Sequence, residues 1–375
     1  MKKKLENRKN NKSIIVSTLI FVITFIAMAG YLIYFNLTQA ESIINNSYNK
    51  RQGVLSRRTI RGSILSDDKT KLAVTNVDDD GNETRYYPYS GLFSHTIGYL
   101  NNGGYGLESL YGYYMLHSNQ NFFEQIGNDL SGNRNTGDNV VTTLNVGLQK
   151  ACYDALGSNR GAVIVMEPST GKILAMVSKP DFDPNTLAAN WSQITGEGSD
   201  SVLVNRATQG LYPPGSTFKL ITMLEYLREH KNDYGQYHYI CDGTYELGNN
   251  TINCVRTTAH GDVDLFSSLA VSCNCSFINI GLSLDLDRYK KTAEKMLFNK
   301  ELPTNLEYNK SRFVLNGESS EWDIAQTSFG QGKTVITPFH LALITCTIAN
   351  NGTLMEPYLV SSVESTNGMT VKKFK

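Results

Sequence analysis

The residues best suited to chemistry are Ser216 and Lys219, in the stretch Tyr-Pro-Pro-Gly-Ser-Thr-Phe-Lys that ends at Lys219. A serine hydroxyl is a poor nucleophile at its ordinary pKa and needs an adjacent base. Lysine is such a base only where burial or neighbouring groups lower its pKa enough to keep the amine neutral. Because Lys219 follows Ser216 by three positions, a helix places both side chains on one face. The sequence therefore predicts nucleophilic catalysis by Ser216.

The surrounding residues predict the helix that must position this pair. Residues 213–215 (Pro-Pro-Gly) stop any preceding element, and the residues that follow Ser216 are apolar: Phe218, Leu220, Ile221, Met223, Leu224 and Leu227. An apolar helix that enters a core removes the Lys219 amine from water, which lowers its pKa. The positive end of the helix dipole also favours negative charge that develops near Ser216.

Ser-x-x-Lys alone is a weak signal. Turns account for two further copies, one of them in a Pro-Ser-Thr-Gly turn, and a third lies just beyond an apolar segment. These copies are Ser47 with Lys50, Ser66 with Lys69, and Ser169 with Lys172. The context of Ser216 therefore selects it among the four.

A second candidate motif, Ser272-Cys-Asn274, lies downstream of the Ser216 helix. Ser-x-Asn is a frequent triplet, since Ser47, Ser131 and Ser365 also begin one. Its position after the Ser216 helix, and the Leu, Ala and Phe residues around it, favour this copy in a packed helical loop.

These motifs, together with Asn205-Arg-Ala207, resemble the active-site region of class B penicillin-binding proteins, the monofunctional transpeptidases of bacterial cell-wall synthesis. The resemblance implies a peptidoglycan D,D-transpeptidase in which Ser216 attacks the penultimate D-Ala carbonyl of a D-Ala-D-Ala stem peptide. It also implies that Lys219 is the general base, that Ser272 relays a proton, and that Asn274 hydrogen-bonds the substrate amide.

The same resemblance implies the partners of the chain. Peptidoglycan stem peptides are the expected substrates, β-lactams are expected to acylate Ser216, and a membrane-embedded glycan polymerase is the expected protein partner. No cofactor is implied. The acceptor amine, the oligomeric state, and the choice among division, elongation and sporulation stay open.

The first 35 residues predict a membrane anchor. Residues 1–12 are rich in Lys and Arg, and residues 13–35 are apolar, with no charge from Ile14 to Phe35, which is long enough to cross a bilayer. The basic flank predicts a cytoplasmic tail and an extracytoplasmic catalytic domain, hence a single-pass protein of the cell membrane. A cleaved signal peptide is the competing interpretation, because Ala27-Met-Ala29 has a small-x-small pattern; the apolar run continues to Phe35, which favours an anchor.

Two domains are expected outside the membrane. Residues 36–150 predict a small β-rich pedestal or dimerisation-like domain, because Arg61-Gly-Ser-Ile-Leu65 and Tyr105-Gly-Leu-Glu-Ser-Leu-Tyr111 resemble the N-terminal region of the same family. Residues 151–375 predict the transpeptidase domain. The gap after the anchor is too short for a glycosyltransferase domain. Three polar residues of the pedestal are expected to be structural: His95, Glu108 and His117.

The expected fold class is α+β. Asn145 is an N-cap for a helix that ends at Gly157, and residues 161–166 and 172–177 predict two buried strands joined by a turn. In the penicillin-recognising, serine β-lactamase-like fold, such a hairpin opens a central antiparallel sheet that is flanked by helices.

The third motif of the family, Lys-Thr-Gly, does not occur in the sequence. Ser328-Phe-Gly-Gln-Gly332 and the helix start at Thr337-Pro338 match the approach to it, and residues 359–371 predict a hairpin. The sequence therefore predicts a chain truncated before this motif, so that the domain is incomplete at its C-terminus. Loss of one oxyanion-hole donor costs about 10²–10³ in rate. A non-catalytic scaffold is thus the alternative function; a β-lactam sensor or β-lactamase is a further one, which the pedestal and single anchor disfavour.

Charge and cysteine content exclude some other functions. With 35 basic and 35 acidic residues, the chain gives no argument for nucleic-acid binding. Cys241 and Cys254 bracket a predicted hairpin, and either a disulfide or two buried free thiols fits them. Cys273-x-Cys275 has neither a second pair nor a His at zinc-like spacing, so no metal site is expected. His260 is expected to have a structural role in a loop.

Overall fold

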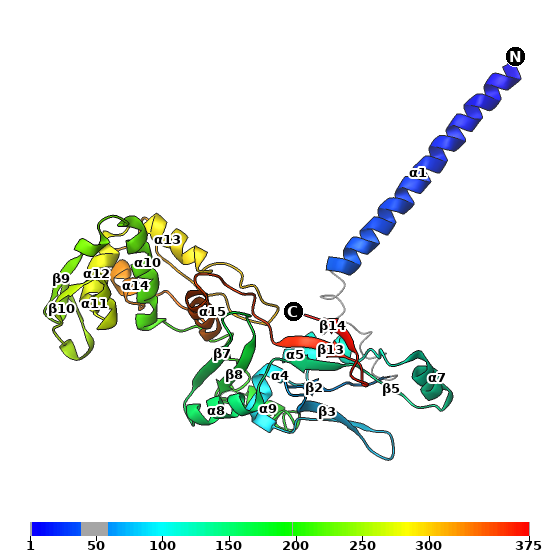
Figure 1. Cartoon of the computed structure of the whole chain (residues 1–375), viewed down its shortest axis with the longest axis horizontal. Helices are drawn as coiled ribbons and strands as arrows, with labels where there is room; N and C mark the ends of the chain where they lie inside the picture. The colour runs from blue at the N-terminus through cyan, green and yellow to red at the C-terminus, as the bar shows by residue number, and fades with distance from the viewer. Residues whose placement is uncertain (1, 39–58, 197, 375) are drawn as a thin grey trace.

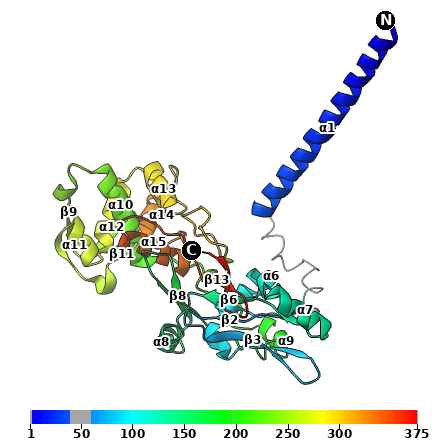
Figure 2. The ribbon, with the colours of Figure 1, turned by 45° about the vertical axis from the view of Figure 1, so that its right-hand side comes forward.

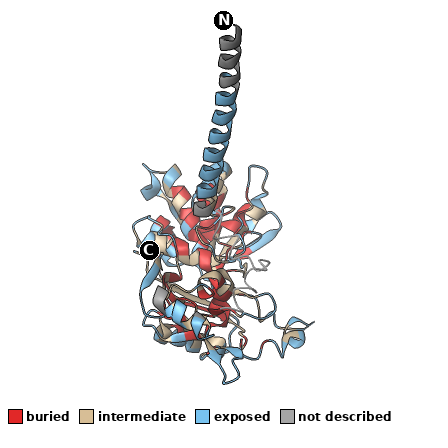
Figure 3. Ribbon diagram, turned by 90° about the vertical axis from the view of Figure 1, so that its right-hand side faces the viewer, coloured by how far each residue is buried: buried red, intermediate tan, exposed pale blue. Residues whose placement is uncertain are grey.

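The computed structural model describes residues 2–38, 59–196 and 198–374. Helix α1 (Lys2–Thr38) contains the span Ile14–Phe35, whose mean hydropathy is 2.3. Residues 14–34 of this span are exposed (Figure 3), as a helix that contacts lipid requires. By length and composition the span fits a single membrane anchor.

The pedestal, defined here as residues 59–142, is built around a six-stranded sheet with the order β14-β13-β6-β2-β3-β4. Its helices are short. The strands of the pedestal are β1 (Thr59–Ile60), β2 (Ile64–Leu65), β3 (Lys71–Val77), β4 (Glu83–Tyr86), β5 (Asn135–Thr136) and β6 (Asn139–Thr142). Its helices are η1 (Ser90–Phe93), α4 (Ser94–Ile97), α5 (Gly106–Leu110), α6 (Gly112–Met115) and α7 (Phe122–Leu130).

The C-terminal hairpin expected from the sequence is present and completes the pedestal sheet. Strand β13 (Val360–Glu364) pairs antiparallel with both β14 (Thr370–Lys373) and β6, and β2 pairs parallel with β6. Residues far apart in the chain therefore lie side by side in one sheet (Figure 1).

A second hairpin joins the pedestal to the rest of the molecule. Strands β7 (Gly161–Met166) and β8 (Ile173–Lys179) are antiparallel, and among the described strands they pair only with each other. The expected central antiparallel sheet is thus represented by this hairpin. Two helices pack against it: α8 (Val146–Leu156), capped by the Asn145 side chain, and α15 (Pro338–Ala349), capped by Thr337. Both caps were expected from the sequence.

The remaining elements form what we call the helical lobe, residues 215–328, which lies at the opposite end of the molecule from the pedestal sheet (Figures 1 and 2). A short helix, α9 (Trp191–Thr195), precedes it. The helices of the lobe are η2 (Gly215–Phe218), α10 (Lys219–Glu229), η3 (Tyr234–Gln236), η4 (Val255–Thr257), α11 (Leu265–Ala270), α12 (Asn274–Ser283), α13 (Leu286–Lys295) and α14 (Glu321–Ser328). Its strands are β9 (His238–Cys241), β10 (Thr244–Leu247), β11 (Asn250–Asn253) and β12 (Gly261–Asp264).

Two hydrophobic cores support these parts. One, which we call the shared core, joins Ile64 and Val140 of the pedestal to Met176 of β8 and Phe339 of α15. The other fills the helical lobe and contains Phe218. Because a single core spans the pedestal and the β7–β8 hairpin, burial of apolar surface holds them together.

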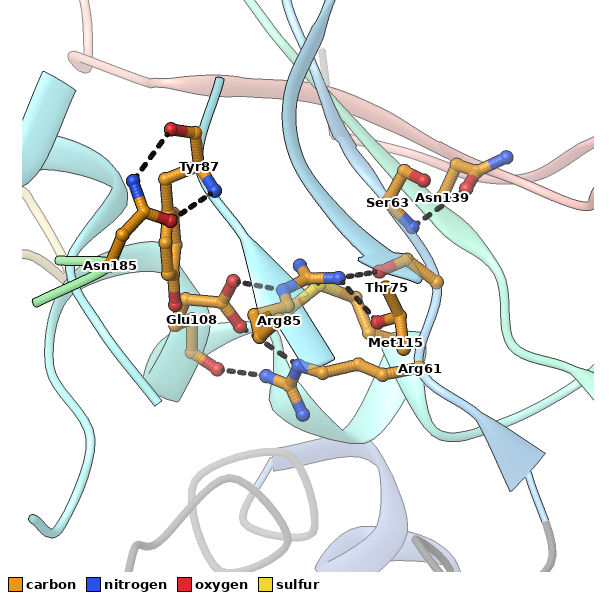
Figure 4. Close-up of polar contacts among 10 residues, drawn as sticks. Arg61, Ser63, Thr75, Arg85, Tyr87, Glu108, Met115, Asn139 and Asn185 are labelled. Carbon is orange, nitrogen blue, oxygen red and sulfur yellow. Dashed lines mark hydrogen bonds and ion pairs between the residues drawn. The ribbon is translucent and has the colours of Figure 1, made fainter. Parts of the chain in front are cut away.

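A buried charge network stabilises the pedestal (Figure 4). The Arg61 and Arg85 guanidinium groups each bind one oxygen of the Glu108 carboxylate, at 2.8 and 2.7 Å. Burial alone would raise the pKa of Glu108, but the guanidinium groups of Arg85 and Arg61 hold it below its ordinary value. His95 lies 2.7 Å from the Val202 carbonyl oxygen, and His117 stacks on a tyrosine ring. All three residues thus have the structural contacts expected of them.

Candidate active site

Ser216 lies in the 3₁₀ turn η2, directly before α10, rather than in the first turn of an α-helix. The backbone of Gly215 donates a hydrogen bond of 2.8 Å to the Gly330 carbonyl oxygen. Gly330 has a φ of 81°, and a Cβ there would lie 1.9 Å from the Gly215 oxygen, so only glycine fits. The Ser-Phe-Gly-Gln-Gly stretch that contains Gly330 therefore packs closely against the turn that carries Ser216.

Phe218 anchors this turn in the helical lobe. Its ring is 1% exposed and lies 5.5 Å from the ring of Phe298 and 6.0 Å from that of Phe313. The neighbouring Ser216 is exposed, whereas Lys219 is fully buried. The local sequence thus places a hydroxyl at the surface directly above a buried amine.

The structure brings the four expected site residues together. Lys219 Nζ lies 3.3 Å from Ser216 Oγ, 2.9 Å from Ser272 Oγ and 2.8 Å from Asn274 Oδ1. Ser272 Oγ donates to Ser216 Oγ at 2.9 Å. The amine is therefore surrounded by the two serine hydroxyls and the asparagine amide.

Ser272 and Asn274 come from the junction between α11 and α12. Ser272 adopts a φ of 54°, the left-handed region that is uncommon for a residue with a side chain. Cys273 then caps α12, because its sulfur accepts from the Ser276 backbone N–H. Asn274 Nδ2 donates to the Asn253 carbonyl oxygen at 3.0 Å, which turns its oxygen toward Lys219.

The hydrogen bonds around Lys219 are compatible with a neutral amine. A neutral amine has two N–H donors and one lone pair, whereas an ammonium has three donors. Two of its partners accept only, the Ser272 carbonyl oxygen at 2.7 Å and Asn274 Oδ1 at 2.8 Å. These two oxygens can accept both N–H groups of a neutral amine. Because Ser272 Oγ donates to Ser216 Oγ, the lone pair of that amine is then left for the proton of Ser216.

Burial shifts the protonation equilibrium of Lys219 toward the neutral amine. It lowers the pKa of Lys219 to about 8, and the nearby Cys273, Cys254 and Cys275 thiols act in the opposite direction. At about pH 7 roughly a tenth of the amine is therefore neutral, far more than for an exposed lysine, and this fraction can act as a general base.

The other Ser-x-x-Lys copies do not form such a site where the structure describes them. Lys69 forms an ion pair with Glu364, and the Ser66 hydroxyl donates to Asp68 instead of contacting Lys69. Ser169 and Lys172 belong to the turn between β7 and β8. The pair at Ser47 lies outside the described residues.

Comparison with known proteins identifies the family. Residues 161–375 match the penicillin binding protein transpeptidase domain, and residues 61–140 match the penicillin binding protein A dimerisation domain. The chain belongs to the penicillin-binding protein transpeptidase family. The first match includes all four site residues, and the second includes the Arg61–Glu108–Arg85 network of the pedestal.

Individual relatives agree with this assignment. The chain is 31% identical to the peptidoglycan D,D-transpeptidase PbpA of Mycolicibacterium smegmatis over 312 residues, 77% of this chain and 61% of the relative. Its fold matches penicillin-binding protein A of M. tuberculosis in an imipenem acyl-enzyme complex, with a TM-score of 0.75, 29% identity, and coverage of 84% of this chain and 77% of that one. A D,D-transpeptidase domain from Eggerthella lenta gives a TM-score of 0.74 and 31% identity, covering 85% and 76%.

The chain spans 61% of the length of PbpA from M. smegmatis and 52% of the length of PbpA from M. tuberculosis. The family membership and the α+β fold are established by these matches, whereas the activity and partners of this chain are treated below as proposals.

One cluster beside the site escaped the sequence analysis. Cys241, Cys254, His260 and Cys273 present ligand atoms that all lie within 4.8 Å of one another. The spacing of the cysteines and His260 along the chain did not indicate this cluster, which the fold assembles. Spacing along the chain missed the cluster because each residue comes from a different element. The Sγ atoms of Cys241 and Cys254 are 3.8 Å apart, and the cysteines are free thiols.

Proposed function

We propose that this chain is a serine-type peptidoglycan D,D-transpeptidase that forms an acyl-enzyme at Ser216. The observation that carries the proposal is the contact of one buried lysine amine with both serine hydroxyls. Lys219 Nζ lies 3.3 Å from Ser216 Oγ and 2.9 Å from Ser272 Oγ, and the Ser272 carbonyl oxygen and Asn274 Oδ1 hold it there. This arrangement turns a buried lysine into a base for an exposed serine.

The proposed reaction begins with acylation. The Ser216 hydroxyl proton passes to Lys219 Nζ while Oγ bonds to the penultimate D-Ala carbonyl carbon of a stem peptide. The helix N-terminus at α10 favours the negative charge that develops on the carbonyl oxygen. The peptide C–N bond then breaks, and the leaving D-Ala amine takes a proton from Ser272, which regains one from Lys219 (2.9 Å).

Deacylation reverses these steps. An amine from a neighbouring stem peptide attacks the acyl carbon and loses a proton to the same residues. The bond from the acyl carbon to Ser216 Oγ then breaks, and these residues return a proton to the Ser216 hydroxyl. We assign Asn274 to the substrate amide, since its amide lies at the edge of the site and is oriented by Asn253. β-Lactams would acylate Ser216 and remain there. The sequence contains no Lys-Thr-Gly, so these assignments are confined to the acylation centre.

We further propose a single-pass protein with its catalytic domain outside the cytoplasm. The basic residues that precede the apolar span support this orientation. A membrane-embedded glycan polymerase is the proposed partner, because cross-linking needs new glycan strands at the same membrane surface.

The test is covalent labelling of the full chain, solubilised in detergent, with a fluorescent penicillin. Ser216→Ala should abolish labelling, and Lys219→Ala should slow it by about 10²–10⁴-fold through loss of the base. The matched control is Ser169→Ala, which removes an exposed serine from another Ser-x-x-Lys copy and should label like the parent chain.

The non-catalytic scaffold is the contrasting function. A parent chain that is folded by circular dichroism but takes no label would overturn the proposed enzyme. Equal labelling of the parent chain and Ser216→Ala would overturn the assignment of the nucleophile.

A further inference from the structure

Four cysteines and one histidine of the helical lobe meet beneath the Ser272–Asn274 loop. Cys241 ends β9, Cys254 follows β11, His260 precedes β12, and Cys273 caps α12. All the thiols here are at most 3% exposed, and Cys275 packs beside them. The proposed reaction assigns no role to these thiols.

The distances do not fit disulfides. The Sγ atom of Cys254 lies 3.8 Å from the Sγ atoms of Cys241 and Cys273, and 3.5 Å from that of Cys275. A disulfide needs about 2.05 Å between sulfurs. The thiols are therefore in contact, with no S–S bond among the described cysteines.

Three of the six distances among the ligand atoms of Cys241, Cys254, His260 and Cys273 fit a tetrahedral metal ion, and all six are within 4.8 Å. Zn²⁺ binds Cys at about 2.3 Å and His at about 2.0–2.1 Å, so that a tetrahedron separates its ligand atoms by about 3.5–3.8 Å. The two Sγ–Sγ distances of 3.8 Å, from Cys254 to Cys241 and to Cys273, have this length. The distance from Cys241 Sγ to His260 Nδ1 is 3.5 Å, which matches a sulfur–nitrogen edge.

We propose that Cys241, Cys254, His260 and Cys273 bind one Zn²⁺ ion. Each of the three thiols releases its proton to solvent on binding, and neutral His260 provides the lone pair of Nδ1. No oxidation or reduction takes place. We assign Cys275 to the surroundings of Cys254 rather than to the ligand set, because the other four ligand atoms are all mutually close.

The local backbone already holds the ligands near one another. The Cys254 N–H donates to the Gly243 carbonyl oxygen, and Gly261 stands opposite Cys241 in the β12–β9 ladder. A turn with positive φ at Arg256 and Thr257 then carries the chain from Cys254 to His260. Hydrogen bonds thus bring these segments together, and the metal would fix them.

The position of Cys273 gives this ion a consequence for the active site. Cys273 stands between Ser272 and Asn274, whose side chains both contact the Lys219 amine. Asn274 also binds the carbonyl oxygen of Asn253, directly before Cys254. Zinc would therefore hold the strained Ser272 backbone and orient both side chains. Cys273 is in this respect a positioning residue, and this second part rests on the proposed function.

Zinc content of the full-length chain, solubilised in detergent and purified without metal chelation, tests the site. We expect about one zinc per chain by mass spectrometry of the metal. Cys241→Ser, Cys254→Ser, Cys273→Ser and His260→Ala should each lose it. Cys346→Ser, which changes a half-buried thiol of α15, and Cys275→Ser should both keep it.

Variants that fail to fold are covered by a second measurement on the parent chain. After zinc is removed with a chelator under reducing conditions, added Co²⁺ should give thiolate charge-transfer and tetrahedral d–d absorption bands. A chain that contains no zinc and gives no such bands with Co²⁺ would overturn the proposal. A thiol count below six in the denatured, unreduced protein would also overturn it, because it would show disulfides. Loss of zinc in Cys275→Ser would overturn the ligand assignment.

Penicillin labelling tests the positioning part. Removal of zinc should slow labelling of Ser216 by about 10²-fold, the cost of a small displacement of catalytic groups. Added Zn²⁺ should restore it, whereas Mg²⁺ should not. A labelling rate that does not depend on zinc content would overturn the positioning role of zinc but would not contradict the zinc site itself. A chain that binds zinc but never labels would instead contradict the proposed enzyme, so the two failures are distinguishable.

Discussion

At the scale of single residues, the proposed acylation depends on a lysine whose pKa is lowered. Burial lowers the pKa of Lys219 to about 8, and the groups that face it, Cys273, Cys254 and Cys275, oppose this shift when ionised. Carboxylates are not among these groups. The lowered pKa means that the unfolded chain binds more protons than the folded one between about pH 8 and the ordinary lysine pKa of 10.5, so this residue opposes folding most below about pH 8.

The rate of penicillin acylation should therefore rise with pH. Because the neutral amine is the reactive form, the rate should increase about tenfold per unit well below the pKa of Lys219 and level off above about pH 8. Stopped-flow labelling from about pH 6 to about pH 9 measures this profile. Ser216→Ala provides the background at each pH. A rate that is flat across the whole range would contradict Lys219 as the base.

The sequence predicted these residues but missed their neighbours, for a physical reason. Ser216 and Lys219 lie on one local turn, so their spacing along the chain already encodes their contact. Ser272 was found by motif order, which reflects a fold that places it against Lys219. The Cys and His cluster has no such local signal, because four elements contribute one ligand each.

At the scale of elements, the sequence predicted local structure well and pairing poorly. The caps at Asn145 and Thr337 are confirmed, because a cap is a hydrogen bond within a few residues. The hairpin at residues 359–371 is confirmed as β13 and β14. The partner of β13, strand β6, could not be predicted. It lies more than 200 residues earlier, and the residues of a strand do not specify which strand pairs with it.

The element that holds the pedestal together is α5, through the Glu108 carboxylate. Glu108→Gln should lower the free energy of unfolding by about 3–5 kcal/mol, because it leaves Arg61 and Arg85 buried without a counter-charge. Urea unfolding followed by circular dichroism measures the change. Glu83→Gln is the matched control: Glu83 forms a half-exposed pair with Arg134, whose loss should cost less than about 1 kcal/mol.

A second consequence of this network is sensitivity to acid. Since the two arginines hold the pKa of Glu108 below its ordinary value, its contribution to stability is present above the unfolded pKa and is lost as pH falls. The Glu108→Gln chain should therefore show a weaker loss of stability on acidification than the parent chain. An equal loss in both would place the acid sensitivity elsewhere.

At the scale of the whole molecule, the shared core makes the pedestal and the β7–β8 hairpin one structural unit. Ile64 and Val140 of the pedestal pack in the same core as Phe339 of α15, which itself precedes the strand β13 that completes the pedestal sheet. The site at Lys219 is supported by the other core, in the helical lobe. The two cores meet through α15, because Phe339 belongs to one and Ile344 to the other.

This connection predicts that the molecule outside α1 unfolds as one cooperative unit. The two tryptophans report on different parts: Trp191 lies 6.1 Å from the ring of Tyr99 in the pedestal, and Trp322 packs in the helical lobe. Chains with Trp322→Phe or Trp191→Phe should give the same urea midpoint by fluorescence. Adding Val140→Ala, which removes two buried methyl groups from the shared core, should lower both midpoints equally, by a free energy of about 1–3 kcal/mol. If only the Trp191 signal moved, the helical lobe, and with it the acylation centre, would be stable independently of the pedestal.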